Sequence, residues 1–166
     1  MLLYIFRHAI TYHTKTNTPY GDEVVSAEIL PEGIPAIEKL AKYLKYISTD
    51  ANYTSPYKRC IQTVEIVSEI SGKSFQLKDV LGEYREDKET FEEFAKRVKD
   101  FLVYLEKQNI KSAAICTHGG VIAGVISFLT KNSYTLPDLH NYPAPGILVT
   151  IENGKLEYKD FNPTSY

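Results

Sequence analysis

Two adjacent basic residues, Arg7 and His8, directly follow a run of apolar residues near the start of the chain. A second histidine, His118, follows another apolar run, and Arg59 lies just beyond a third predicted strand. The planar fork of an arginine binds phosphoryl oxygens with two N–H groups, and a neutral imidazole is a competent nucleophile near neutral pH. These residues predict phosphoryl transfer, with His8 forming a phosphohistidine and a charged His118 holding a phosphate oxygen.

The elements that must position these side chains are strands, which we expect at residues 2–6, from residue 51, and at residues 112–116. Short, continuously apolar runs are typical of buried parallel strands. Strands alternate with helical patterns, which predicts an α/β fold with three layers, α/β/α, around a mostly parallel open sheet. Ligands bind at the carboxyl ends of such strands. We therefore expect the two arginines and two histidines to meet at one edge of the sheet, although each alone is more typical of an exposed position.

Four helices connect the predicted strands. Three of them show apolar residues at helical spacing, namely those over residues 30–47 and 90–106 and the one that begins with Ser55 as its N-cap and Pro56 as its first residue. The fourth, over residues 119–129, is apolar. A capping box formed by Thr90 and Glu93 marks the start of the helix at residues 90–106.

The remaining segments are a loop, a weak strand and a hairpin. Residues 11–27 predict a long, irregular polar loop, and long loops in compact domains are often functional. Residues 74–80 predict a weak strand. Residues 147–161 predict a C-terminal β-hairpin, in which Asn153 and Gly154 supply the two positive-φ positions of the turn.

A phosphate ester also needs a proton for its leaving oxygen, and the stretch "LGEYRED" offers one acid. Glu83 in this stretch follows the weak predicted strand, so we expect it near the same edge of the sheet. Three nearby carboxyl groups, those of Glu86, Asp87 and Glu89, compete for the role of general acid.

These motifs resemble the histidine phosphatase superfamily, the phosphoglycerate-mutase-like clan. The stretches "FRHAI", "YTSPYKRCIQTVEI", "LGEYRE" and "ICTHGGVI" occur in the order of that family, and the resemblance covers residues 2–160. The most specific match is the Ser-Pro-x-x-Arg-x-x-Gln-Thr pattern, formed by Ser55, Pro56, Arg59, Gln62 and Thr63.

The resemblance implies a role for each candidate residue. His8 would be the phosphorylated nucleophile, and Arg7, Arg59 and His118 would form the phosphate pocket. Glu83 would donate a proton to the leaving group. Chemistry of this family implies neither a metal nor a cofactor.

Two departures from the family pattern occur after His8. Ala9 replaces the usual glycine, which adds a methyl group beside the expected phosphate. The family often has an asparagine a few residues further on that contacts phosphate. Here Thr11, Thr14 or Asn17 could take over that contact, and the sequence does not separate them.

Length and charge limit the other classes of function. The 166 residues suit a single domain, 1–166, with a sizeable core. A net charge of −2 indicates no excess of basic residues of the kind that binds nucleic acid or an anionic membrane. No apolar run is long enough for a membrane span, and two cysteines form no disulfide framework. The expectation is a cytoplasmic protein.

The sequence therefore predicts a phosphatase that acts on a small phosphorylated metabolite or a phosphoprotein. Three alternatives stay open, namely phosphoryl transfer of the phosphoglycerate mutase type, a protein phosphohistidine phosphatase, and a non-catalytic phosphate-binding module. The mutases of the clan carry longer insertions over the active site, so the short chain favours hydrolysis. The oligomeric state cannot be read from the sequence.

Overall fold

The computed structural model describes residues 1–163, and its centre is a six-stranded sheet with the strand order β3-β2-β4-β1-β5-β6. Its parallel strands are β1 (Leu2–Arg7), β2 (Ala51–Thr54), β3 (Gln76–Leu77) and β4 (Ser112–Thr117). The antiparallel strands β5 (Ile147–Glu152) and β6 (Lys155–Asp160) follow β1 in the sheet. The prediction of a mostly parallel open sheet with a C-terminal hairpin is confirmed.

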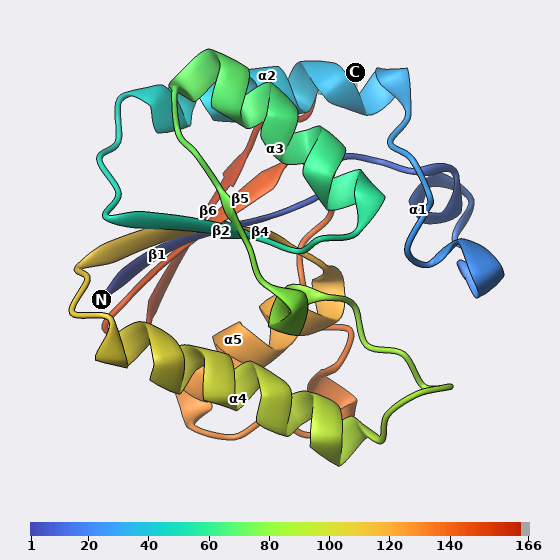
Figure 1. The fold of residues 1–166 in the computed structure, drawn as a ribbon, viewed down its shortest axis with the longest axis vertical. Helices are drawn as coiled ribbons and strands as arrows, with labels where there is room; N and C mark the ends of the chain where they lie inside the picture. Colours follow the sequence, from blue (N-terminus) through green and yellow to red (C-terminus); the bar gives the residue numbers. More distant parts are fainter. Residues whose placement is uncertain (164–166) are drawn as a thin grey trace.

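Helices cover both faces of the sheet and complete the three predicted layers (Figure 1). One face carries α2 (Ile34–Lys45) and α3 (Lys58–Ser71), and the other carries α4 (Phe91–Lys107) and α5 (Gly119–Lys131). Single helical turns lie in the connections, at η2 (Pro31–Gly33), η3 (Asp79–Leu81) and η4 (Leu136–Asp138). Among residues 1–163, no helix combines the length and the apolar character that crossing a membrane requires.

The alternation of side chains along β1 explains why both faces are covered. Leu3 and Ile5 are buried in the cluster that α4 and α5 complete, whereas Phe6 is buried in the cluster beneath α2 and α3. A strand with apolar side chains on both faces is stable only between two layers of helices. The continuous apolar run at the start of the chain thus demands a central strand.

Two local predictions of the sequence are confirmed in detail. Thr90 caps α4 by accepting from the backbone N–H of Glu93, and the Glu93 side chain accepts from the backbone N–H of Thr90. The turn between β5 and β6 has φ of 51° at Asn153 and 75° at Gly154. This pair of positive φ angles matches the twist of a two-residue hairpin.

Three boundaries differ from the prediction. The helix α3 begins at Lys58 with Tyr57 as its N-cap, rather than at Pro56 with Ser55 as its N-cap, because the chain bends at Pro56 and Tyr57 after β2. The predicted weak strand contracts to the two residues of β3 and continues into η3. The predicted irregular loop contains a short helix, α1 (Tyr12–Thr16), and the turn η1 (Gly21–Glu23). All three changes occur at the carboxyl edge of the sheet, where tertiary contacts override local propensity.

Candidate active site

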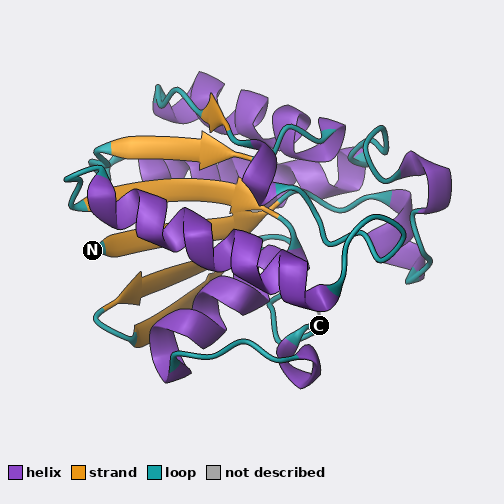
Figure 2. Cartoon of the chain, turned by 60° about the horizontal axis from the view of Figure 1, so that its bottom comes forward, coloured by secondary structure: helices purple, strands orange, loops and turns teal. Residues whose placement is uncertain are grey.

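The four predicted phosphate-site residues meet at the carboxyl edge of the sheet. Figure 2 shows that long connections gather at this edge. Arg7 is the last residue of β1 and pairs in register with Thr117 at the end of the neighbouring strand β4. His8 and His118 each follow these strand ends, and their ring centroids lie 5.4 Å apart. Arg59 lies in the first turn of α3, after β2. Adjacent parallel strands therefore deliver the two imidazoles side by side.

His8 is held in the tautomer that a nucleophile requires. Its Nδ1 lies 2.8 Å from the carbonyl oxygen of Ala9 and donates to it, which leaves the lone pair on Nε2. The ring is 1% exposed. Burial lowers the pKa of His8 well below its ordinary value, and the positive charges of Arg59 and Arg7 lower it further. The imidazole is therefore neutral at physiological pH and can attack through Nε2.

The surroundings of His118 favour the neutral ring, whereas the sequence interpretation expects a charged one. Burial lowers its pKa well below the ordinary value, with Arg59 as the next largest cause. Its Nε2 lies 2.8 Å from the hydroxyl oxygen of Ser55, and that oxygen accepts from the backbone N–H of Tyr57. When the Ser55 hydroxyl donates to Nε2, the hydrogen of His118 resides on Nδ1. A neutral His118 thus offers one N–H from Nδ1.

Arg59 is a fully buried guanidinium that three side-chain and backbone groups hold in place. One of its Nη1 hydrogens goes to the carbonyl oxygen of Val24. The ring of Tyr20 covers the guanidinium at 4.0 Å, and the ring of Tyr57 lies 5.5 Å away. Contact with aromatic faces stabilises a cation in a desolvated place. The segment around η1, far from α3 in sequence, thereby fixes the direction of this arginine.

Arg7 completes the ring of positive charge. Its Nη1 donates to the carbonyl oxygen of Pro143 at 3.4 Å, and its guanidinium lies 4.9 Å from the ring centroid of Tyr142. The segment after η4 therefore holds Arg7 as the segment around η1 holds Arg59.

Four nitrogen atoms in this cluster are buried and lack a hydrogen-bond partner within residues 1–163. They are Arg7 Nε, Arg59 Nε, Arg59 Nη2 and His118 Nδ1, and no other buried side-chain nitrogen or oxygen of the described residues lacks a partner. Leaving such a donor unsatisfied costs about 1–3 kcal/mol, and more for a charged group. All four belong to residues that lie close to His8, so an oxyanion bound beside its ring could satisfy groups that the fold leaves unpaired.

Glu83 lies at the same edge, after η3. Its Oε1 accepts from the backbone N–H of Tyr84 at 2.8 Å, and a Cβ added to Gly120 would lie 2.9 Å from this oxygen. The glycine therefore allows the carboxyl group to approach the start of α5, next to His118. Burial raises the pKa of Glu83 above its ordinary value, although Arg59 and Arg7 act in the opposite direction. A raised pKa favours the protonated form that a general acid needs.

The three competing acids are placed differently. Glu86 and Asp87 are exposed. The carboxylate of Glu89 forms a 2.7 Å ion pair with Arg97 and also accepts from the backbone N–H of Arg85. Glu83 combines proximity to the buried arginines with a raised pKa, which makes it the best placed of the candidate acids.

The sequence interpretation missed Arg97, which supports the Glu83 segment from α4. Its Nη1 donates to the carbonyl oxygens of Val80 at 2.7 Å and Gly82 at 2.9 Å. Its guanidinium also lies 4.7 Å from the ring centroid of Phe94. An arginine on the apolar face of an amphipathic helix was the available signal, since Arg97 lies three residues after Phe94 and four residues before Phe101, which are both buried.

The residues proposed to replace the missing asparagine serve mainly to shape α1. Thr11 and Thr14 form its capping box, and Asn17 is its C-cap, with φ of 53°. Thr11 Oγ1 instead bonds the hydroxyl of Tyr20 at 2.8 Å. Tyr20 is thus a second residue that the sequence interpretation missed, and it lies over Arg59.

Ala9 also behaves differently from the expectation. Its methyl group is buried in the cluster that contains Phe6 and α2, and a Cβ added to Gly33 would lie 3.3 Å from it. Its backbone N–H donates to Thr63 Oγ1 at 2.9 Å, which ties the end of β1 to α3. The extra methyl group therefore contributes to packing.

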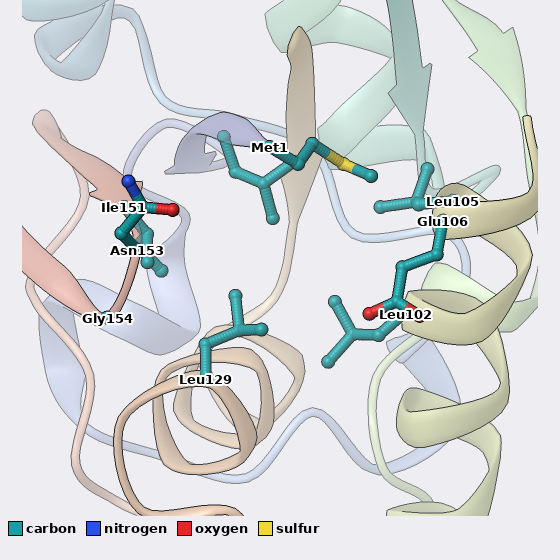
Figure 3. Close-up of a pocket in the computed structure, with 9 residues that line it drawn as sticks. Met1, Leu102, Leu105, Glu106, Leu129, Ile151, Asn153 and Gly154 are labelled. Carbon is teal, nitrogen blue, oxygen red and sulfur yellow. The ribbon is translucent and has the colours of Figure 1, made fainter. Parts of the chain in front are cut away.

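Two neighbouring hollows of about 470 Å³ each lead from solvent to Glu83. The first lies between residues 19–24 and residues 83–87, and the second lies between residues 83–86 and residues 139–142. A further hollow of about 240 Å³ is far from these residues, between the start of β1, the turn that joins β5 and β6, α4 and α5 (Figure 3). Its nine lining residues are mostly apolar and include neither histidine nor arginine.

Comparison with known proteins assigns the family. The model of the histidine phosphatase superfamily (branch 1) matches residues 3–87 and 82–164. The chain therefore belongs to the histidine phosphatase superfamily, as the motifs predicted.

Individual relatives are distant. A protein from Hydrogenobacter thermophilus with the provisional name phosphoserine phosphatase 2 is 23% identical, over 77% of this chain and 78% of that protein. The alpha-ribazole phosphatase from Shigella flexneri has a TM-score of 0.77 at 19% identity, covering 98% of this chain and 96% of that one. A phosphoglycerate mutase from Bacillus anthracis has a TM-score of 0.71 at 16% identity, covering 97% and 93%. The two structures establish the shared fold, which hosts both phosphatases and a mutase.

Proposed function

We propose that this protein is a phosphatase that hydrolyses phosphate monoesters through a phosphoryl group carried on His8. The observation that supports this most is the set of four buried, unpartnered nitrogen atoms around the neutral imidazole. Phosphoryl transfer depends mainly on positioning and charge neutralisation, and these atoms offer both. Membership of the superfamily and the relatives named as phosphatases agree with this reaction.

In the first step, the lone pair on Nε2 of His8 attacks phosphorus and forms an N–P bond. The ester P–O bond breaks in line with it, and the protonated carboxyl group of Glu83 gives its proton to the leaving oxygen. Arg7, Arg59 and the Nδ1 hydrogen of His118 hold the equatorial oxygens, where negative charge must be stabilised.

In the second step, water attacks the phosphorus of phospho-His8. Glu83, now a carboxylate, accepts a proton from that water, the N–P bond breaks, and inorganic phosphate leaves. The acid and base of the cycle are therefore one group in two protonation states. We propose that two guanidinium groups supply the neutralisation, so that no metal or other cofactor takes part.

Trapping the intermediate tests the proposal. The protein is mixed with a radiolabelled aryl phosphate and quenched within milliseconds in alkaline detergent, because phosphohistidine is labile in acid. We expect label on His8, no label and no turnover in His8→Ala, and retained label in His140→Ala, which removes an exposed histidine. Arg59→Ala should lower kcat/KM by about 10² or more. Label on another residue would contradict the proposal.

The fate of the phosphoryl group separates hydrolysis from the alternatives. We expect release of inorganic phosphate in equal amount to the alcohol, even with an added alcohol acceptor. Transfer to the acceptor would indicate a mutase-type reaction. Binding of phosphate without turnover of any ester would indicate a non-catalytic module.

A further inference from the structure

The entrance to the candidate active site is lined by carboxylates. Asp22 on η1 and Glu86 and Asp87 after Glu83 line the first hollow, and Glu86 also lines the second. All three side chains belong to exposed residues. We name Asp22, Glu86 and Asp87 the acidic rim.

The only cation among the residues that line these hollows is already paired. Arg85 forms an ion pair with Asp87 at 3.4 Å, and it keeps 24% of its side chain exposed. Asp22 and Glu86 form no ion pair within residues 1–163. The net charge at the entrance is therefore negative, while the charge around His8 is positive.

The buried site adjoins these hollows, because Tyr20, which covers Arg59, lines the first hollow and Tyr142, which lies against Arg7, lines the second. The unpartnered nitrogens belong to Arg59 and His118, which are fully buried, and to the largely buried Arg7. Glu83 interacts electrostatically with Arg7 and Arg59, and it lines both hollows. A phosphate ester held by these groups would direct its alcohol part past Glu83 toward the acidic rim.

We propose that the acidic rim selects small phosphate monoesters whose alcohol part carries an ammonium group and disfavours those whose alcohol part carries a carboxylate. The inference rests on the proposed function and concerns the alcohol part of the substrate alone. An ammonium group near Asp22 and Glu86 gains two attractive interactions, and a carboxylate there finds no unpaired cation. His8 is 1% exposed, so a slender, small alcohol reaches it more easily than a folded phosphoprotein does.

A series of three esters of nearly equal size tests this selection. The values of kcat/KM are measured for 2-aminoethyl phosphate, 2-hydroxyethyl phosphate and phosphoglycolate, which differ by an ammonium, a hydroxyl and a carboxylate. We expect that order of preference, with about tenfold between the first and the last at low salt. The ratio should shrink at high salt, because exposed charges are screened.

Charge variants remove the effect of leaving-group acidity, because the same two esters are compared in each protein. The ratio of kcat/KM for the ammonium ester to that for the hydroxyl ester should fall about threefold in Asp22→Asn or Glu86→Gln, and about tenfold in the double variant. Glu86→Lys should reverse the preference. Glu38→Gln, an exposed carboxylate on α2, makes the same charge change and should leave the ratio unaltered.

The outcomes separate the two proposals. An unchanged ratio in the double variant, or a wild-type preference for phosphoglycolate, would overturn the inference, while label on His8 would still support the proposed function. If the wild type hydrolysed none of the three esters and did not hydrolyse the aryl phosphate, the proposed function and the inference would both be overturned. Turnover of the aryl phosphate by each variant shows that it is folded.

Discussion

At the scale of single residues, one environment shifts two pKa values in opposite directions. Burial beside Arg59 and Arg7 lowers the pKa of His8, and burial raises the pKa of Glu83. The charged form of each group is disfavoured by desolvation. Both shifts favour the uncharged form, a free imidazole on His8 and a protonated carboxyl group on Glu83, which is the pairing that attack and protonation of the leaving group require.

The pH dependence of kcat/KM should follow from these directions. His8 must be unprotonated, and its lowered pKa keeps it so well below pH 6.5, so the acidic limb should lie at low pH. Glu83 must be protonated, so activity on alkyl phosphates should fall as the pH rises through its raised pKa. Together these limbs predict an acidic optimum.

The alkaline limb should disappear with aryl phosphates and in Glu83→Gln, because a good leaving group needs no proton. Steady-state pH profiles with both kinds of ester measure this difference. An alkaline limb of equal depth for both esters would assign it to another group.

The contribution of Tyr20 to kcat/KM can be divided into that of its ring and that of its hydroxyl group by two substitutions. Its ring covers Arg59 at 4.0 Å, and its hydroxyl bonds Thr11. Tyr20→Phe keeps the ring and should change kcat/KM less than threefold. Tyr20→Leu loses the cation–π contact, worth about 1–2 kcal/mol when desolvated, and should lower kcat/KM about tenfold. Equal losses in both variants would show that the hydroxyl itself contacts the substrate.

At the scale of elements, the site depends on connections held by helices that carry none of its chemistry. The long helix α4 starts at a regular capping box and packs on the sheet through Phe94, Val98 and Phe101. From this helix, Arg97 also donates hydrogen bonds to two backbone carbonyl groups just before Glu83. The position of the proposed acid is thereby coupled to the packing of α4.

Replacing Arg97 should affect protonation of the leaving group more than phosphate binding. Arg97→Lys keeps the positive charge but loses the planar fork, whose Nε and Nη2 bind Glu89 while Nη1 donates to the carbonyl oxygens of Val80 and Gly82. We expect kcat/KM for alkyl phosphates to fall about tenfold or more, with aryl phosphates changed less than threefold.

A parallel loss for alkyl and aryl esters would indicate a general structural role for Arg97. Lys99→Arg, on the same helix, provides the control for a cation change on α4, and it should alter neither ester.

At the scale of the whole molecule, the buried positive charge lowers the free energy of unfolding when no anion is bound. Arg59 is fully buried, and it forms no ion pair with a carboxylate among the described residues. Two of its nitrogen atoms also lack a hydrogen-bond partner there. Desolvated cations without partners are destabilising. An anion that binds the folded state alone should therefore stabilise it.

Inorganic phosphate at 100 times its Kd should add about 2.7 kcal/mol to the free energy of unfolding. For a chain of this size that corresponds to a rise of about 5–10 °C in Tm, measured by thermal unfolding with and without phosphate. The rise should vanish in Arg59→Met. It should persist in Lys58→Met, which removes the adjacent exposed cation paired with Glu28. A rise of equal size in Arg59→Met would place the phosphate elsewhere.

Much of the fold could be predicted from local patterns. The apolar run of β1, the capping box at Thr90 and the Asn153-Gly154 turn each specify their structure through neighbouring residues. The strand–helix alternation then places the ends of β1, β2 and β4 at one edge. For that reason the meeting of Arg7, His8, Arg59 and His118 could be predicted too.

The rest of the site was decided by contacts between distant segments. No local pattern shows that Tyr20 covers Arg59, that Arg97 holds the segment of Glu83, or that α3 begins only at Lys58. The sequence by itself determined the order of the elements and the chemical types at the strand ends. Only the tertiary structure decided the direction in which the pKa values of the two histidines and of Glu83 shift, because desolvation depends on what surrounds a group in space and not along the chain.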